Sequence, residues 1–122
     1  MPQPAAYVTL QDRAITLRIA GDIDHTFGFD APGVDAGRES VLTFGANPSL
    51  ANGEDVSLEW TLNGKDVLIQ TFGTGEARAW QEIVEKNILK ASDNKLTVRL
   101  TDTDNDGEID IQDVVLLYTQ RS

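Results

Sequence analysis

The chain has 122 residues, a formal net charge of -10 at pH 7 and no cysteine. This length suits one domain with one hydrophobic core, and the charge argues against binding nucleic acid or an anionic membrane, because phosphate groups would be repelled. The lack of cysteine excludes disulfides, thiolate metal sites and cysteine nucleophiles, but it leaves the compartment open.

The N-terminal segment carries no targeting signature. Residues 1–10 lack the basic and apolar regions of a signal peptide. No run approaches the roughly 20 apolar residues of a membrane helix, so we expect no membrane insertion. The sequence therefore leaves the localisation unknown; an extracellular or cell-surface location is expected if the chain is part of a longer or processed protein.

Period-2 alternation, which is typical of half-buried strands, dominates the rest of the chain. In residues 55–64, for example, the apolar Leu58, Trp60 and Leu62 alternate with polar neighbours. We therefore expect Trp60 to lie in the core. Strands are expected in residues 14–19, 26–29, 41–44, 55–64, 65–72 and 95–100.

Turn signals separate these strands. Asn63 and Gly64 tolerate the positive φ of both central positions of a type I′ turn, so they predict a hairpin. Further turns are expected at the Pro-Gly pair in residues 30–37, in the polar residues 45–55 and in the glycine-rich residues 72–77.

Residues 77–94 favour a helix over a strand. Trp80, Val84 and Ile88 recur at helical spacing, and helix propensity is good through residues 82–86. A short strand over residues 82–84 followed by a turn would also fit. The C-terminal residues 109–120 fit either a long last strand or a turn leading into a terminal helix.

Many short strands separated by polar turns are typical of an antiparallel sandwich or barrel, and the βαβ rhythm of a parallel sheet is absent. We therefore expect an all-β fold, an antiparallel β-sandwich of the jelly-roll type, with one short helix around residues 79–90. No linker or internal repeat divides the sequence, so a single domain is expected over residues 1–122.

Four short motifs resemble those of the galactose-binding-domain-like jelly rolls, the architecture of many carbohydrate-binding modules. They are Leu62-Asn63-Gly64, Ile88-Leu89-Lys90, Asn94-Lys95-Leu96-Thr97-Val98 and Asp113-Val114-Val115-Leu116-Leu117-Tyr118. Residues 25–35 also look like the first half of such domains. The resemblance spans most of the chain and implies the jelly-roll fold. It implies little about a ligand, because the motifs are core and turn positions.

Residues 102–113 hold five Asp, one Glu and one Asn, and their spacing matches an EF-hand-type calcium loop. Such a loop takes oxygen ligands at positions 1, 3 and 5, glycine at 6, and a carboxylate at 12, which is Asp here, as is common in dockerin-like loops. Calcium is the expected cofactor, because a hard dication removes the repulsion among neighbouring carboxylates. The candidate ligands are Asp102, Asp104, Asp106, Glu108, Asp110 and Asp113.

The flanks of this acidic segment leave two arrangements open. An EF-hand loop follows a helix, whereas this segment follows the expected strand at residues 95–100. A dockerin-like half-motif would need a helix over residues 111–120, and a jelly roll would need a closing strand over residues 109–118. In the second case Asp113 would lie too far along the strand to close the same shell, and an acidic hairpin turn without metal would also fit. A bound ion would be structural, because no paired helix is present to move.

Catalytic motifs are weak. His25 is the only histidine, and with no cysteine it could build a zinc site only with carboxylates. None of the serines lies in a G-x-S-x-G elbow, and the sequence cannot single out a carboxylate pair for glycoside hydrolysis. We therefore expect no enzyme activity, and a small hydrolase is the more remote alternative.

Trp80 is the candidate platform for a sugar ring, because the apolar face of a sugar packs on an indole. Arg78 and Gln81 beside it could supply hydrogen bonds. The alternative is that Trp80 caps one end of the sandwich.

These features predict a non-catalytic β-sandwich module that binds structural calcium and a carbohydrate or other surface ligand. The expected partner is a glycan or another protein; the oligomeric state is not predicted. The first alternative is a structural or assembly protein of a virion, appendage or multimer that has no small ligand. A dockerin-like docking tail is a further alternative, but only one acidic loop is present instead of two.

Overall fold

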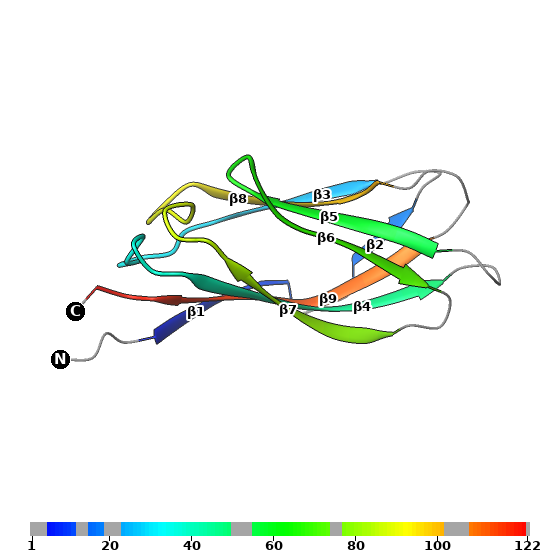
Figure 1. Cartoon of the computed structure of the whole chain (residues 1–122), viewed down its shortest axis with the longest axis horizontal. Coiled ribbons are helices and arrows are strands. Elements are labelled where there is room, and N and C mark those ends of the chain that lie inside the picture. The colour runs from blue at the N-terminus through cyan, green and yellow to red at the C-terminus, as the bar shows by residue number, and fades with distance from the viewer. Residues whose placement is uncertain are drawn as a thin grey trace.

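The computed structural model describes residues 5–11, 15–18, 23–49, 55–73, 77–101 and 108–121. Within these ranges the chain forms nine strands in two facing sheets, and every strand pairing is antiparallel (Figure 1). The predicted all-β fold, an antiparallel β-sandwich of the jelly-roll type, is confirmed. The described part of the chain contains no helix that could cross a membrane.

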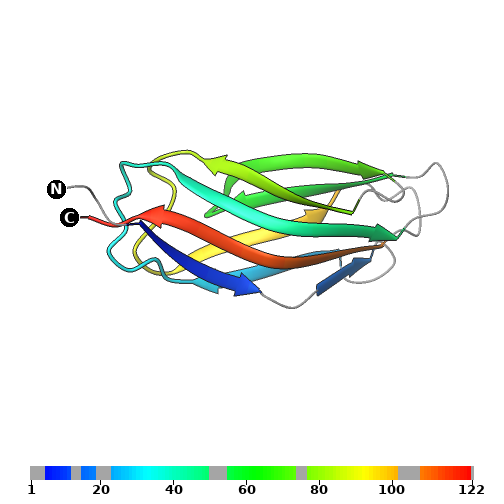
Figure 2. The ribbon, with the colours of Figure 1, turned by 90° about the horizontal axis from the view of Figure 1, so that it is seen from below.

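Sheet A has the strand order β1-β9-β4-β7, and the short β2 also pairs with β9. Its strands are β1 (Ala5–Gln11), β2 (Ile15–Arg18), β4 (Ser40–Ser49), β7 (Arg78–Val84) and β9 (Glu108–Thr119). Sheet B has the order β3-β8-β5-β6. Its strands are β3 (Asp24–Phe29), β5 (Asp55–Leu62), β6 (Lys65–Gly73) and β8 (Asn94–Leu100). Figure 2 shows β1, β9, β4 and β7 side by side, seen from the outer side of sheet A.

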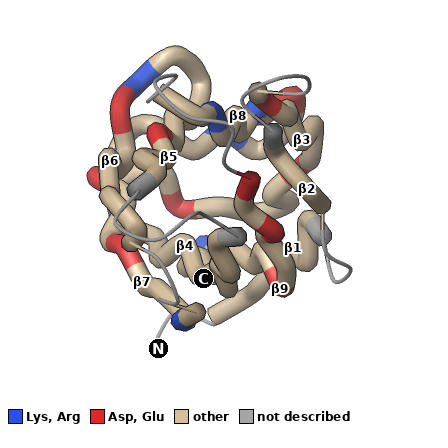
Figure 3. Tube along the Cα trace, turned by 90° about the vertical axis from the view of Figure 1, so that its right-hand side faces the viewer, with Lys and Arg blue, Asp and Glu red and all other residues tan. Residues whose placement is uncertain are grey.

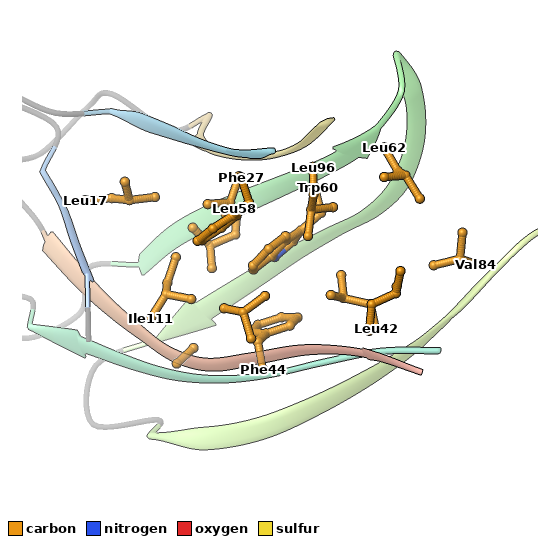
Figure 4. Packing of buried hydrophobic residues seen from close by; sticks show 14 of the residues in the cluster. Leu17, Phe27, Leu42, Phe44, Leu58, Trp60, Leu62, Val84, Leu96 and Ile111 are labelled. Atoms are coloured by element: carbon orange, nitrogen blue, oxygen red, sulfur yellow. The ribbon is translucent and has the colours of Figure 1, made fainter. Parts of the chain in front are cut away.

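The core lies between the sheets and is built from the alternating apolar residues that the sequence predicts. Leu58, Trp60 and Leu62 are fully buried on β5. The ring of Trp60 packs against Phe44 of the opposite sheet with centroids 4.6 Å apart (Figure 4). Burying large side chains from both inner faces is the main force that holds two such sheets together.

The prediction of a helix around residues 79–90 is wrong, because residues 78–84 form strand β7 and residues 86–87 form a turn. Trp80 and Val84 share a face in either structure, since a spacing of four residues fits both periods. Pairing with β4 decides for the strand and leaves Ile83 exposed on the outer face. The C-terminal segment is the long strand β9, not a terminal helix.

The predicted hairpin at Asn63 and Gly64 is confirmed. Both residues have positive φ, 53° and 82°, and they connect β5 to β6 directly. This turn lies at one end of the sandwich, which we call the hairpin end. The opposite end, where β8 stops and β9 begins, is called the acidic end, and Figure 3 looks onto it along the strands.

Candidate functional site

The acidic segment is only partly described. Asp102, Asp104 and Asp106 lie outside the described residues, whereas Glu108, Asp110 and Asp113 belong to β9. The residues on either side of the segment, Leu100 and Glu108, end and begin strands of different sheets. The segment therefore connects sheet B to sheet A at the acidic end.

Asp110 already has a structural partner on the neighbouring strand. The hydroxyl of Thr16 on β2 donates a hydrogen bond to Asp110 Oδ1 at 2.5 Å, and the two residues are directly opposite in the register. Glu108 and Asp110 alternate with the buried Ile109 and Ile111, so both carboxylates lie on the outward side of β9. The hydrogen bond from Thr16 fixes Oδ1 of Asp110, and Oδ2 is the oxygen that a metal ion could use.

Asp113 lies far from the start of β9. Five residues of extended chain separate it from Glu108, which is about 16 Å at the usual strand rise. Calcium binds its ligand oxygens at roughly 2.3–2.6 Å, so two carboxylates on one ion must lie close together. Asp113 therefore cannot share an ion with Glu108 while β9 is a strand.

Asp113 instead forms a bulge in β9. Gly45 of β4 is opposite Gln112 and Thr43 is opposite Val115, so β9 has an extra residue between these pairs. Asp113 has φ of 53°, in the left-handed region. Among the described residues, no group of three or more His, Asp or Glu side chains is placed to hold a metal ion.

The bulge borders a shallow depression of about 410 Å³ on β4, β7 and β9. Gly45 opens it, because a Cβ at this position would lie 3.2 Å from Cγ of Gln112. The lining residues are mostly small or polar: Thr43, Phe44, Gly45, Ala46, Asn47, Ala77, Arg78, Ala79, Trp80, Gln81, Gln112 and Asp113. Their amides, hydroxyl and carboxylate can donate and accept hydrogen bonds.

All three predicted ligand residues line this depression, but they lie on opposite faces of β7. Trp80 is opposite the buried Phe44, so its side chain belongs to the inner face. Arg78 is opposite the buried Ala46 and shares that face. Gln81 is opposite Thr43 on the outer face, so it is the one whose side chain extends outward from the sheet.

Arg78 and Trp80 form a closed cluster with Phe72 at the edge of the sandwich. The guanidinium carbon of Arg78 lies 5.2 Å from the ring centre of Trp80 and 5.4 Å from that of Phe72. The two rings meet edge to face at 6.4 Å. These are the distances of cation–π and aromatic pairs. A sugar could stack on the Arg78 side of the indole only after displacing the guanidinium.

Gln112 and Gly45 were not predicted as site residues. Gln112 lies inside the acidic segment, where the spacing of the carboxylates dominated the interpretation. Its place in the depression depends on which residue of β4 is opposite the bulge.

His25 is exposed on β3 and packs against Phe27 with centroids 4.6 Å apart.

No protein-family model and no curated protein matches the sequence. Part of dimeric latent PorU from Porphyromonas gingivalis matches 93% of this chain with a TM-score of 0.65 and 11% identity. This chain spans only 13% of that protein.

Two carbohydrate-binding modules match over nearly their whole lengths. The CBM36-1 domain of a multidomain xylanase from the hindgut metagenome of Trinervitermes trinervoides has a TM-score of 0.58 and 10% identity, covering 98% of this chain and 100% of that one. A CBM36 module in complex with calcium and xylotriose has a TM-score of 0.55 and 12% identity, covering 94% and 99%. Identities this low show a shared fold, so the resemblance to carbohydrate-binding modules is confirmed as a resemblance of the sandwich.

Proposed function

We propose that this chain is a non-catalytic module that binds a glycan in the depression at Gly45. The observation that carries the proposal is the lining: Gln81 and Gln112 extend amides from β7 and β9, with Thr43 between them. Amides and hydroxyls both donate and accept hydrogen bonds, as sugar hydroxyls require. The shared fold with carbohydrate-binding modules adds support.

The predicted contacts at β7 take different roles in this proposal. Gln81 contacts the sugar, and Trp80 with Arg78 fixes the edge strand that carries Gln81. A shallow surface is suited to holding a sugar chain without excluding water from it, which fits binding more than hydrolysis. A screen of glycoside substrates that finds turnover would contradict the non-catalytic part of the proposal.

The test compares two double variants on a panel of immobilised glycans. Gln81→Ala with Gln112→Ala removes both amides from the depression and is expected to reduce binding at least tenfold, since each lost hydrogen bond contributes roughly 1 kcal/mol. Gln70→Ala with Gln120→Ala removes two glutamines elsewhere and should leave binding unchanged. Equal losses in both variants, or no glycan bound by the unmodified chain, would contradict the site.

We further propose that the acidic segment holds one structural calcium ion. The spacing of Asp102, Asp104 and Asp106 supports this, together with Glu108 and Asp110 at the start of β9. The candidate shell leaves out Asp113, which is on the bulge. The ion would connect the end of β8 to the start of β9 and so stabilise the junction between the two sheets.

A further inference from the structure

The outer face of sheet A carries an apolar row that crosses four strands. Tyr7 of β1 is opposite Leu117 of β9, Leu117 is opposite Val41 of β4, and Val41 is opposite Ile83 of β7. Tyr7, Ile83 and Leu117 are 71%, 61% and 41% exposed. Antiparallel sheets that face water usually place polar side chains on that side.

The next row toward the acidic end is also free of charge. It consists of Thr9, Val115, Thr43 and Gln81, again one residue from each strand. The two rows together hold eight residues and no ionisable acid or base other than the phenol of Tyr7. This is notable in a chain of which 25% of the residues are charged.

The outer face of sheet B is different and shows what a solvent-facing side of this protein looks like. Arg99 on β8 is opposite Asp24 on β3 and Glu59 on β5, so charges of both signs alternate across it. Hydroxyl pairs satisfy one another there, as in Ser57 and Thr71 at 2.8 Å. The contrast between the two faces marks sheet A as the face that meets a partner.

We infer that the outer face of sheet A docks onto the same face of a second copy of this chain. A partner with net charge of -10 is repelled unless the contact avoids charge, and the two rows provide a contact of this kind. A two-fold axis running across the strands lays the rows of one copy on those of the other. The same axis points the two acidic ends in opposite directions, which keeps like charges apart.

The size of the face sets the strength of the contact. Four strands are about 19 Å wide, and the seven residues of β1 or β7 are about 24 Å long, which gives about 450 Å² per copy. A contact that buries about 900 Å² in total falls in the size range of weak, transient interfaces. The dimer is therefore weak and concentration-dependent. The exposed Glu39 and Glu85 lie directly beyond the pair Ser40 and Val84, at the rim of this face.

Sedimentation velocity from roughly 10 μM to 1 mM protein tests this inference, at low and at high salt. The unmodified chain is expected to shift from monomer to dimer as concentration rises, and more readily at high salt, because screening weakens the repulsion between copies. A chain that stays monomeric throughout this range, or a dimer that salt dissociates, would overturn the inference.

Two isoleucines make a matched pair of variants. Ile83→Lys on the edge strand β7 places a charge in the apolar row and should abolish the dimer. Ile69→Lys on β6, the edge strand of sheet B, changes a residue of nearly equal exposure, 60%, and should leave the dimer intact. Equal loss in both variants would contradict the assignment of the face.

Tyr7→Thr provides a second variant in case Ile83→Lys unfolds, since threonine keeps the strand propensity of β1. Neither Tyr7 nor Ile83 lines the depression at Gly45. Glycan binding by the monomer is therefore expected to survive both substitutions. Thr43 and Gln81 belong to both the depression and the second row, so the dimer and a bound glycan would exclude each other, but each proposal has its own readout.

Discussion

At the scale of single residues, a buried amide explains two motifs of the sequence. Asn94 is 1% exposed, and its side chain donates to the carbonyls of Phe29 and Lys90 and accepts from the backbone N–H of Lys90 and from Asn63 Nδ2. Asn63 in turn donates to the carbonyl of Ile88. This network ties β3, the hairpin and the loop after β7 together at the hairpin end. Asn63 and Asn94 therefore have a structural role: their side chains hold the loops of the hairpin end together.

Removing the Asn94 side chain is predicted to cost about 3 kcal/mol of unfolding free energy. Asn94→Ala leaves several buried backbone and amide groups without partners, and each unsatisfied group costs roughly 1–3 kcal/mol. Urea unfolding measures the change, with Asn47→Ala on the exposed side of β4 as the control, which should change stability by less than about 0.5 kcal/mol. A loss below about 1 kcal/mol for Asn94→Ala would show that water replaces the network.

At the scale of elements, the bulge on β9 gives the depression its shape. The extra residue between the partners of Thr43 and Gly45 requires left-handed backbone at Asp113. Residues with a Cβ pay roughly 1 kcal/mol for that conformation, and glycine does not. The position therefore carries strain that a substitution can remove.

Asp113→Gly is predicted to raise the unfolding free energy by up to about 0.5 kcal/mol, because the strain of roughly 1 kcal/mol that it removes is partly offset by the greater entropy of glycine in the unfolded chain. Asp110→Gly, three residues earlier on the same strand, should lower stability, since it loses the hydrogen bond from Thr16 and gains only chain entropy in the unfolded state. Thermal or urea unfolding of both variants measures the difference. If Asp113→Gly is less stable only when calcium is present, Asp113 is a metal ligand and the shell proposed above is incomplete.

The strands also show which features of the fold the local sequence can predict and which it cannot. Alternation predicted the strands around Trp60 and Leu96, because a period of two is visible within a few residues. The helix over residues 79–90 failed, because Trp80 and Val84 satisfy both periods and only pairing with β4 distinguishes them. The depression was beyond prediction for a related reason. It depends on the register between β4 and β9, which places Gly45 opposite Gln112, and the local sequence of neither strand determines that register.

At the scale of the whole molecule, charge is unevenly distributed along the sandwich. Residues 101–113 at the acidic end contain six carboxylates and no lysine or arginine. The loops at the hairpin end carry cations beside their acids: Arg38, Lys86, Lys90 and Arg121 all line shallow surfaces there. Arg18 is opposite Glu108, but the other carboxylates of residues 101–113 have no cation beside them in the sequence, so repulsion among them opposes folding.

Calcium is predicted to raise the melting temperature by about 5–10 °C relative to EGTA, because it binds the folded acidic segment and cancels this repulsion. Magnesium at the same concentration should have a smaller effect, since it demands tighter octahedral geometry and gives up water reluctantly. Differential scanning calorimetry measures all three conditions on the same sample.

Two double variants of equal charge change separate a site from general screening. Asp104→Ala with Asp106→Ala is expected to abolish the calcium-dependent rise, because it removes two ligands of the proposed shell. Asp66→Ala with Glu85→Ala removes two exposed carboxylates from the hairpin end and should keep it. If both variants lose the rise equally, calcium acts only by lowering the net charge. If calcium and EGTA give the same melting temperature in the unmodified chain, residues 102–113 are an acidic connection between strands, and the sandwich holds its two sheets together through the core around Trp60 alone.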